Sequence, residues 1–186
     1  SGVEVIRRTR RPGLRELIAS SNLQGPVSVG HIGYILGPRL NAAGRLDTAM
    51  DSYELLATRS ADRGRELALK LEESNRRRQL LTAEAVEKAR ALALQDGELA
   101  PLIFVADEDI LGGIAGLVAS KLTEEFYRPS VIVQLAPEVS RGSARSIPEW
   151  NVTAALDRCS TLLVRHGGHA AAAGFEVENH QLDNLR

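Results

Sequence analysis

The sequence predicts an α/β protein in which a long helix leads into a small mixed sheet flanked by helices. Apolar residues recur at helical intervals over residues 60–94. After this stretch, short apolar runs bounded by turn residues alternate with further helical patterns, which is typical of strands and helices packed in layers. With 186 residues, 44% of them hydrophobic, the chain is long enough for two small domains, each with a modest core.

The N-terminal part is predicted to be irregular. Residues 3–6 are expected to form a short strand, and residues 14–20 a helix that ends in a polar Ser-Ser-Asn sequence. Glycine, proline and aliphatic residues alternate over residues 23–38, which indicates an extended loop that follows a surface. Helical signals strengthen from Thr48 onward.

The long helix is expected to begin at Ser60, a plausible cap, and to end near Leu94. Its middle, residues 72–79, is polar on every side, and a helix of that kind commonly bridges two domains through solvent. Arg76 to Arg78 are therefore expected to form a solvated face.

The C-terminal part has the pattern strand, helix, strand, strand, helix, strand. Expected strands cover residues 101–106, 131–135, 139–146 and 175–178, and expected helices cover residues 112–127 and 152–166. Gly167 and Gly168 are expected to stop the second helix near His166 and to open a binding loop.

Charge and cysteine content exclude several classes of protein. The formal net charge of −1 predicts neither a nucleic-acid nor a membrane partner for the chain as a whole, so any anion site must be local. The single cysteine, Cys159, excludes an internal disulfide framework and fits a reducing compartment, and no apolar run approaches the length of a membrane span. We expect a cytoplasmic protein, and the lack of an initiator methionine is compatible with a piece of a longer one.

One candidate anion site lies between Arg39 and Arg45. A guanidinium group matches phosphate oxygens with a planar fork of donors, and the small residues between the two arginines leave room for a ligand. Asn41 is suited to cap a turn there. The alternative is that both arginines tie down a loop through carboxylates such as that of Asp47.

A second candidate lies between Arg141 and Ser146. By the two-residue period of a strand, Arg141, Ser143 and Arg145 share one side, where hydroxyl and guanidinium groups suit phosphate and sugar. The alternative is an exposed polar strand face. The third candidate is His169, which lies between a glycine pair and four alanines; its alternative role is structural, with the ring satisfying a carbonyl.

These motifs together resemble the RecJ branch of the DHH phosphoesterase superfamily. The resemblance runs from about Pro12 to Val177. The family patterns G-P-R-[IL]-N-A-A-G-R, G-V-x-G-I-V-A-S-R-L, G-S-x-R-S and G-G-H-x-x-A-A-G are matched by residues 37–45, 113–122, 142–146 and 167–174. A departure is Ile110-Leu111, where the family usually has Trp-His.

The resemblance implies three parts: residues 1–56 as the C-terminal remnant of a DHH domain, residues 57–97 as a connecting helix, and residues 98–186 as a DHHA1 domain. It also implies hydrolysis of single-stranded DNA, from 5′ to 3′, in DNA repair and recombination, with two Mn²⁺ or Mg²⁺ ions activating water. The Asp-His-His motif and the aspartates that hold these ions have no counterpart here, so we expect the chain alone to bind no metal and to be inert.

By motif match, Arg45 and Arg145 would clamp phosphates, Ser143 and Ser146 would donate hydrogen bonds, and the catalytic His169 would lie nearest the scissile phosphate. Asn41 would orient its segment. The other expected substrate-binding residues are Arg39, Gly167 and Gly168. Two alternatives stay open: a phosphoesterase for oligonucleotides or dinucleotides, and a non-catalytic nucleic-acid-binding scaffold that meets other repair or replication proteins.

Overall fold

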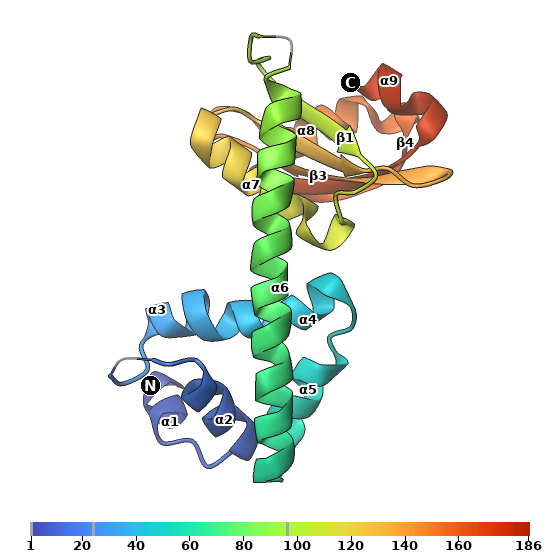
Figure 1. Cartoon of the computed structure of the whole chain (residues 1–186). Coiled ribbons are helices and arrows are strands. Elements are labelled where there is room, and N and C mark those ends of the chain that lie inside the picture. Colours follow the sequence, from blue (N-terminus) through green and yellow to red (C-terminus); the bar gives the residue numbers. More distant parts are fainter. Residues whose placement is uncertain (1, 24, 96) are drawn as a thin grey trace. The chain divides into compact units, whose positions relative to one another are not determined.

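The chain divides into two compact units, residues 1–80 and residues 81–186 (Figure 1). The computed structural model describes residues 2–23, 25–95 and 97–186. No helix within these ranges is both long and apolar enough to cross a bilayer.

The described regular elements of the first unit are all helices. Its elements are α1 (Gly2–Arg7), α2 (Pro12–Ser20), α3 (Val29–His31), the π-helix η1 (Ile32–Leu36), α4 (Gly37–Leu46), α5 (Met50–Ala57) and the first part of α6 (Ala61–Ala93). Its core is built from aliphatic side chains of these helices: Leu17, Val27, Leu36, Ala43, Leu55, Leu67, Ala68 and Leu71.

Two expectations for this unit were wrong. Residues 3–6 lie in α1 rather than in a strand. Of residues 23–38, expected to be an extended loop, residues 29–38 form α3, η1 and the start of α4, because Ser28 caps α3 and exchanges hydrogen bonds with His31 in a capping box. Residue 24 lies outside the described residues. Pro38 lies in the first turn of α4, where its missing N–H costs nothing.

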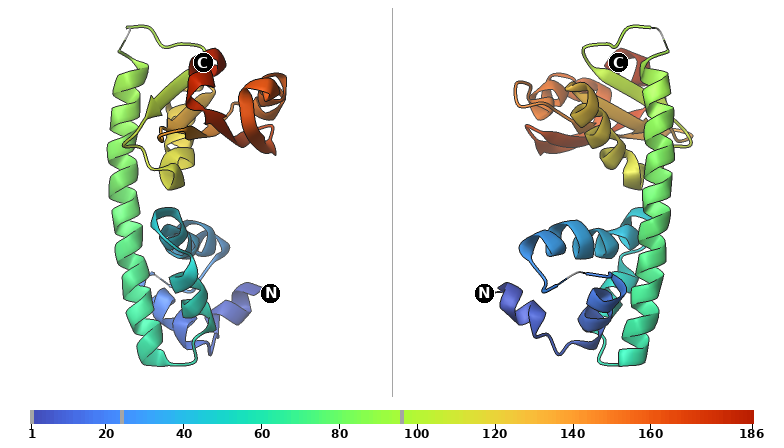
Figure 2. Two further views of the ribbon diagram at one scale, coloured as in Figure 1. Left: turned by 90° about the vertical axis from the view of Figure 1, so that its right-hand side faces the viewer. Right: turned by 60° about the vertical axis from the view of Figure 1, so that its left-hand side comes forward.

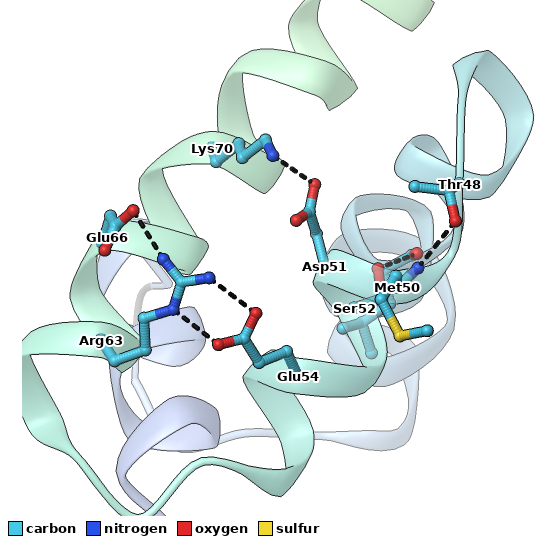
Figure 3. Close-up of polar contacts among 9 residues, drawn as sticks. Thr48, Met50, Asp51, Ser52, Glu54, Arg63, Glu66 and Lys70 are labelled. Carbon is cyan, nitrogen blue, oxygen red and sulfur yellow. Dashed lines mark hydrogen bonds and ion pairs between the residues drawn. The ribbon is translucent and has the colours of Figure 1, made fainter.

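Ion pairs connect α5 to α6 (Figure 3). Arg63 donates from Nε and Nη2 to both carboxylate oxygens of Glu54, at 2.7 and 2.6 Å, and Lys70 Nζ lies 2.8 Å from Asp51 Oδ2. The hydrogen bonds from Arg63 lower the pKa of Glu54. These pairs lie at the surface, so they fix the orientation of the helices more than they add stability.

The long helix α6 matches the expected span, but its polar middle is not exposed to solvent on every side. Leu71 is fully buried and Asn75 is 3% exposed. The Asn75 side-chain oxygen accepts a hydrogen bond of 3.0 Å from Arg78 Nη2, which satisfies a polar group that burial would otherwise leave unpaired. The prediction of a fully solvated middle was therefore wrong, because α6 packs against its own unit there.

The second unit contains a small mixed sheet, as expected, but with five strands rather than the four expected. Its strands are β1 (Ile103–Asp107), β2 (Ser130–Gln134), β3 (Val139–Arg145), β4 (Leu163–His169) and β5 (Ala172–Glu178), in the order β1-β2-β3-β5-β4. Its other elements are α7 (Gly112–Phe126), α8 (Val152–Arg158), η2 (Ser160–Leu162), η3 (Asn179–Gln181) and α9 (Leu182–Leu185). The strands β1 and β2 are parallel and joined through α7, whereas every other pairing is antiparallel.

The two faces of this sheet differ in what covers them. α7 packs against β2 and β3, and α8 packs against β4 and β5 (Figure 2). The apolar core under α8 and α9 includes Ala144, Leu156, Phe175 and Val177. Side chains alternate along a strand. The neighbours of Ala144 on β3, and of Phe175 and Val177 on β5, therefore point to the opposite face of the sheet.

The glycine pair does not end a helix, contrary to expectation. α8 already ends at Arg158, and Gly167 and Gly168 lie inside β4, which forms a hairpin with β5. A Cβ atom at Gly168 would lie 2.4 Å from the carbonyl oxygen of Ala172. The glycine is needed for close approach of two strands, which the sequence pattern does not distinguish from a helix stop.

Candidate nucleic-acid interface

Arg141, Ser143 and Arg145 share one side of β3, as expected. Ser140, Gly142 and Ala144 are buried, whereas Arg141 is exposed and Ser143 and Arg145 are half-buried between them. This alternation places Arg141, Ser143 and Arg145 on the face opposite the α8 core.

Strand pairing brings the glycine–histidine hairpin onto the same face. Ala172 of β5 pairs with Arg145 on one side and with His169 on the other, and Gly174 pairs likewise with Ser143 and Gly167. Two strand spacings of ~4.8 Å put Arg145 and His169 roughly 10 Å apart at the backbone. Alanine and glycine alone lie between them, so a ligand can approach the sheet closely.

The guanidinium of Arg145 lies against α7. Its Nη1 donates to the carbonyl of Ala144 at 2.8 Å. A Cβ atom at Gly116 would lie 2.7 Å from Nη2 of Arg145, so the missing side chain of Gly116 makes the space that the guanidinium occupies. Gly116 is therefore a positioning residue that the motif reading did not single out.

Replacing Gly116 with alanine is expected to displace the Arg145 guanidinium without unfolding the chain. The atom that a new methyl group would meet is the end of a flexible side chain, and alanine favours a helix by ~1 kcal/mol over glycine. We expect an unchanged or higher melting temperature together with several-fold weaker binding of an oligothymidylate, measured by fluorescence anisotropy. Gly33→Ala, a helical position with nothing near its Cβ, is the matched control; equal affinities for both variants would contradict the positioning role.

His169 and Ser146 are held differently. The His169 side chain is exposed, and its ring makes no hydrogen bond within the described ranges, while its carbonyl accepts from Thr153 Oγ1 at 2.8 Å. The backbone of His169 is thus held by α8, while its ring does not serve as a structural hydrogen-bond donor to the described residues. The hydroxyl of Ser146 donates to the Trp150 carbonyl at 2.6 Å, which commits it to the turn after β3.

In the first unit, Arg39 is committed to a structural contact. Its Nε donates to Glu72 Oε2 of α6 at 2.5 Å and its Nη1 to the Ile35 carbonyl at 2.8 Å. Its side chain is only 15% exposed. The carboxylate alternative therefore describes Arg39, although its partner is Glu72 rather than the expected Asp47.

The segment around Asn41 is a helix, so the expected turn is absent. Asn41 is exposed within α4 and caps nothing. Arg45 follows Arg39 by six positions in the helix, and at 100° per residue the two side chains point roughly 120° apart around the helix axis. They do not form a clamp on one face.

Arg45 lies near another guanidinium of its own unit. It is half-buried in the last turn of α4. Burial, and secondarily the positive charge of Arg45, lower the pKa of Arg78 on α6. Arg78 was expected on a solvated face, and it is half-buried instead; the all-polar stretch around it carried no signal for this burial.

No cluster that would hold a metal ion exists within the described residues, by the criterion of three or more histidine, cysteine, aspartate or glutamate side chains brought together. The residues present do not fit the metal centre that the family resemblance implies.

The register of the mixed sheet thus places Ser143 and Arg145 of β3 on one face with Gly167 and His169 of β4. No family model matches the chain. Over 188 residues it is 36% identical to the single-stranded-DNA-specific exonuclease RecJ of Bacillus subtilis, which covers 100% of this chain and 24% of that protein. To RecJ of Salmonella typhimurium it is 33% identical over 188 residues, which is 95% of this chain and 32% of the relative.

Two of the solved structures to which the chain is similar are also of RecJ proteins. RecJ from Thermus thermophilus in complex with Mn²⁺ superposes with a TM-score of 0.88 at 30% identity, covering 99% of this chain and 27% of that one. Another structure of exonuclease RecJ bound to manganese gives a TM-score of 0.82 at 30% identity, over 99% of this chain and 46% of that one. The chain is similar to these RecJ proteins along 95–100% of its own length, and it spans about a quarter to a third of the curated relatives it matches.

Proposed function

We propose that this chain is the strand-binding portion of a metal-dependent exonuclease that hydrolyses phosphodiester bonds of single-stranded DNA. The observation that supports it is the single sheet face shared by Ser143, Arg145 and His169. The RecJ relatives are named for this activity, and the chain is similar to them along its whole length. Residues 1–56, 57–97 and 98–186 would then be the end of a DHH domain, its connecting helix and a DHHA1 domain.

The chain's own residues hold and orient the strand. The guanidinium of Arg145 presents a planar fork to phosphate oxygens, and the Ser143 hydroxyl adds a donor on the same face. The exposed imidazole of His169 lies on the same face of the sheet. In the proposed complex it would lie nearest the scissile phosphate. Mn²⁺ or Mg²⁺, held by residues elsewhere in the whole protein, would activate the attacking water and stabilise the developing charge.

The setting we propose for the whole protein is DNA repair and recombination in the cytoplasm, with other repair or replication proteins as partners. Polarity from 5′ to 3′ is part of the same proposal. It rests on the family resemblance rather than on a residue of this chain.

Oligothymidylate binding tests the proposal directly. The chain is expected to bind a single strand weakly at low salt, with log K falling linearly with log salt concentration by ~0.7 for each phosphate contacted. Added Mn²⁺ should produce no hydrolysis by the chain alone. Absence of binding at low salt, or an affinity that does not change with salt concentration, would contradict the proposal.

Assay of the whole protein distinguishes the exonuclease from a dinucleotide phosphoesterase. An exonuclease should release nucleotides from a long oligothymidylate at least as readily as it splits a dinucleotide. Preference for the dinucleotide would favour the second activity, and binding without hydrolysis of either would favour a scaffold.

A further inference from the structure

A cavity of about 570 Å³ opens next to Ser143 on the same face of the sheet. Its wall combines the first residues of α7 with side chains from β2, β3, β4 and β5. Ligand-binding cavities commonly have volumes of ~300–1,000 Å³, so this space is large enough for one nucleotide unit. None of the site residues expected from the family motifs, apart from Ser143 and Gly167, belongs to it.

Four paired residues form a polar row across the cavity. Gln134 of β2 pairs with Arg141 of β3, Arg141 pairs with Glu176 of β5, and Glu176 pairs with Arg165 of β4. Because residues paired across strands point to the same face, all four side chains lie on the side of Ser143.

One carboxylate in this row lies between two guanidiniums. Arg165 donates to Glu176 from Nε at 2.7 Å and from Nη2 at 2.6 Å, and Arg141 Nε lies 2.9 Å from Glu176 Oε1. Hydrogen bonds from Arg165, together with the positive charges of both arginines, lower the pKa of Glu176, so it is ionised at neutral pH. The three groups therefore carry a net charge of +1.

The positive charge faces the open space. The Arg141 and Arg165 side chains are each 70% exposed, whereas that of Glu176 is 15% exposed. Nη1 of Arg165 has no hydrogen-bond partner within the described ranges. Glu176 thus orients both guanidiniums from below and leaves their outer donors available to an anion.

The floor of the cavity is backbone. Gly174 lies between Ser143 and Gly167, and the position of a Cβ atom at Gly167 has nothing within 4 Å. A phosphodiester can approach a floor of this kind without meeting side chains. The surrounding donors come from guanidinium and hydroxyl groups, which suit phosphate and sugar.

We propose that this cavity is a second phosphate subsite for a single strand of nucleic acid, with Arg141 and Arg165 as its donors. The inference rests on the proposed function, and it extends the binding surface beyond Ser143 and Arg145. Arg145 follows Arg141 by four positions in β3, so their Cα atoms are about 13–14 Å apart. This distance is longer than one nucleotide of an extended nucleic-acid strand. Ser143 lies midway between the two subsites.

An exposed ion-pair network without a ligand is the alternative role for the same residues. It predicts no effect on nucleic-acid binding, because surface ion pairs contribute at most ~1 kcal/mol to stability and nothing to affinity for a ligand that never reaches them. The two roles are separated by measuring affinity, its salt dependence and thermal stability on the same variants.

The test compares Arg141→Gln, Arg165→Gln and the double variant with Arg158→Gln in the intact chain. Arg158 is an exposed arginine at the end of α8, on the helix that covers the other face, so it controls for the loss of one positive charge. Each cavity variant is expected to bind oligothymidylate several-fold more weakly than the control, with melting temperatures unchanged. If both arginines contact one phosphate, the double variant should lower the salt slope by ~0.7 in total.

A ladder of oligothymidylates, from two nucleotides upward, supplies a second measurement. Wild-type affinity should rise by a step at the length that reaches the cavity, and the double variant should lack that step. Cavity variants that bind every length as the Arg158→Gln control does would overturn the subsite while leaving the proposed function intact, provided that Arg145→Gln still weakens binding. Failure of the wild-type chain to bind at all would overturn the proposed function itself.

Discussion

Replacing Arg145 with glutamine is expected to weaken the binding of oligothymidylate about tenfold to a hundredfold. Hydrogen bonds to charged groups contribute ~1.5–3 kcal/mol each, and every ~1.4 kcal/mol corresponds to a factor of ten in affinity. Arg145 is the guanidinium of the shared face that α7 and the Ala144 carbonyl hold in place. Fluorescence anisotropy at fixed low salt measures the change.

Two further variants make this prediction specific. Arg145→Lys keeps the charge but loses the planar fork, so its affinity should lie between those of the wild type and Arg145→Gln. Arg158→Gln, which removes a positive charge from α8, should bind nearly as the wild type does. If lysine and glutamine at position 145 gave the same affinity as arginine, the strand would not contact this residue.

Replacing Gly13 with alanine is expected to destabilise the first unit by about 3 kcal/mol, the upper end of the usual cost of overpacking. A Cβ atom there would lie 1.7 Å from the carbonyl oxygen of Leu55, and Gly64 of α6 approaches Gly13 so closely that a Cβ at Gly64 would lie 3.1 Å from its Cα. The atoms that would have to move belong to the backbone, which cannot give way as a side chain does. Thermal unfolding followed by circular dichroism should show a loss of roughly 10–20 °C.

The choice of probe sharpens this experiment. Trp150 is the single tryptophan and lies in the second unit, so its fluorescence reports that unit, whereas circular dichroism reports helices of both. Gly13→Ala should shift the helical transition more than the tryptophan transition. Gly33→Ala is the glycine-to-alanine control, and a Gly13→Ala variant that melts with this control would refute the close packing at Gly13.

Elements with strong periodicity were predicted correctly from the sequence, whereas the segments that contain Gly37-Pro38 and Gly167-Gly168 were predicted wrongly. The long helix, the four expected strands, the helix that follows the first of them and the shared side of β3 were confirmed, because they depend on the spacing of side chains along a single element. The expected helix over residues 152–166 was too long, since α8 ends at Arg158 and β4 begins at Leu163. Gly37-Pro38 and Gly167-Gly168 were misread because glycine and proline also serve helix starts and close strand pairs. Whether a glycine begins a helix, ends one or lies in a close strand pair depends on the segment that packs against it. The local sequence carries no information about that segment.

The site was predictable to the same extent. The grouping of Ser143 with Arg145 followed from the strand period, and the family motif added His169. The commitment of Arg39 to Glu72 was not predictable, since those residues are 33 positions apart and meet only through helix packing. The cavity likewise depends on the register of β4 against β5, which places Arg165 beside Glu176 and includes an irregularity near Val164 that no period reveals.

The contact between Gly116 and Arg145 has a consequence for the entropy of recognition. An arginine side chain carries ~2 kcal/mol of rotamer entropy, which an unconstrained residue loses when it takes hold of a ligand. In this protein the guanidinium already rests against the bare backbone of a helix and donates to a neighbouring carbonyl. Much of the rotational freedom of the Arg145 side chain is therefore lost on folding. Binding of a nucleic-acid strand at this residue would cost correspondingly little further side-chain entropy.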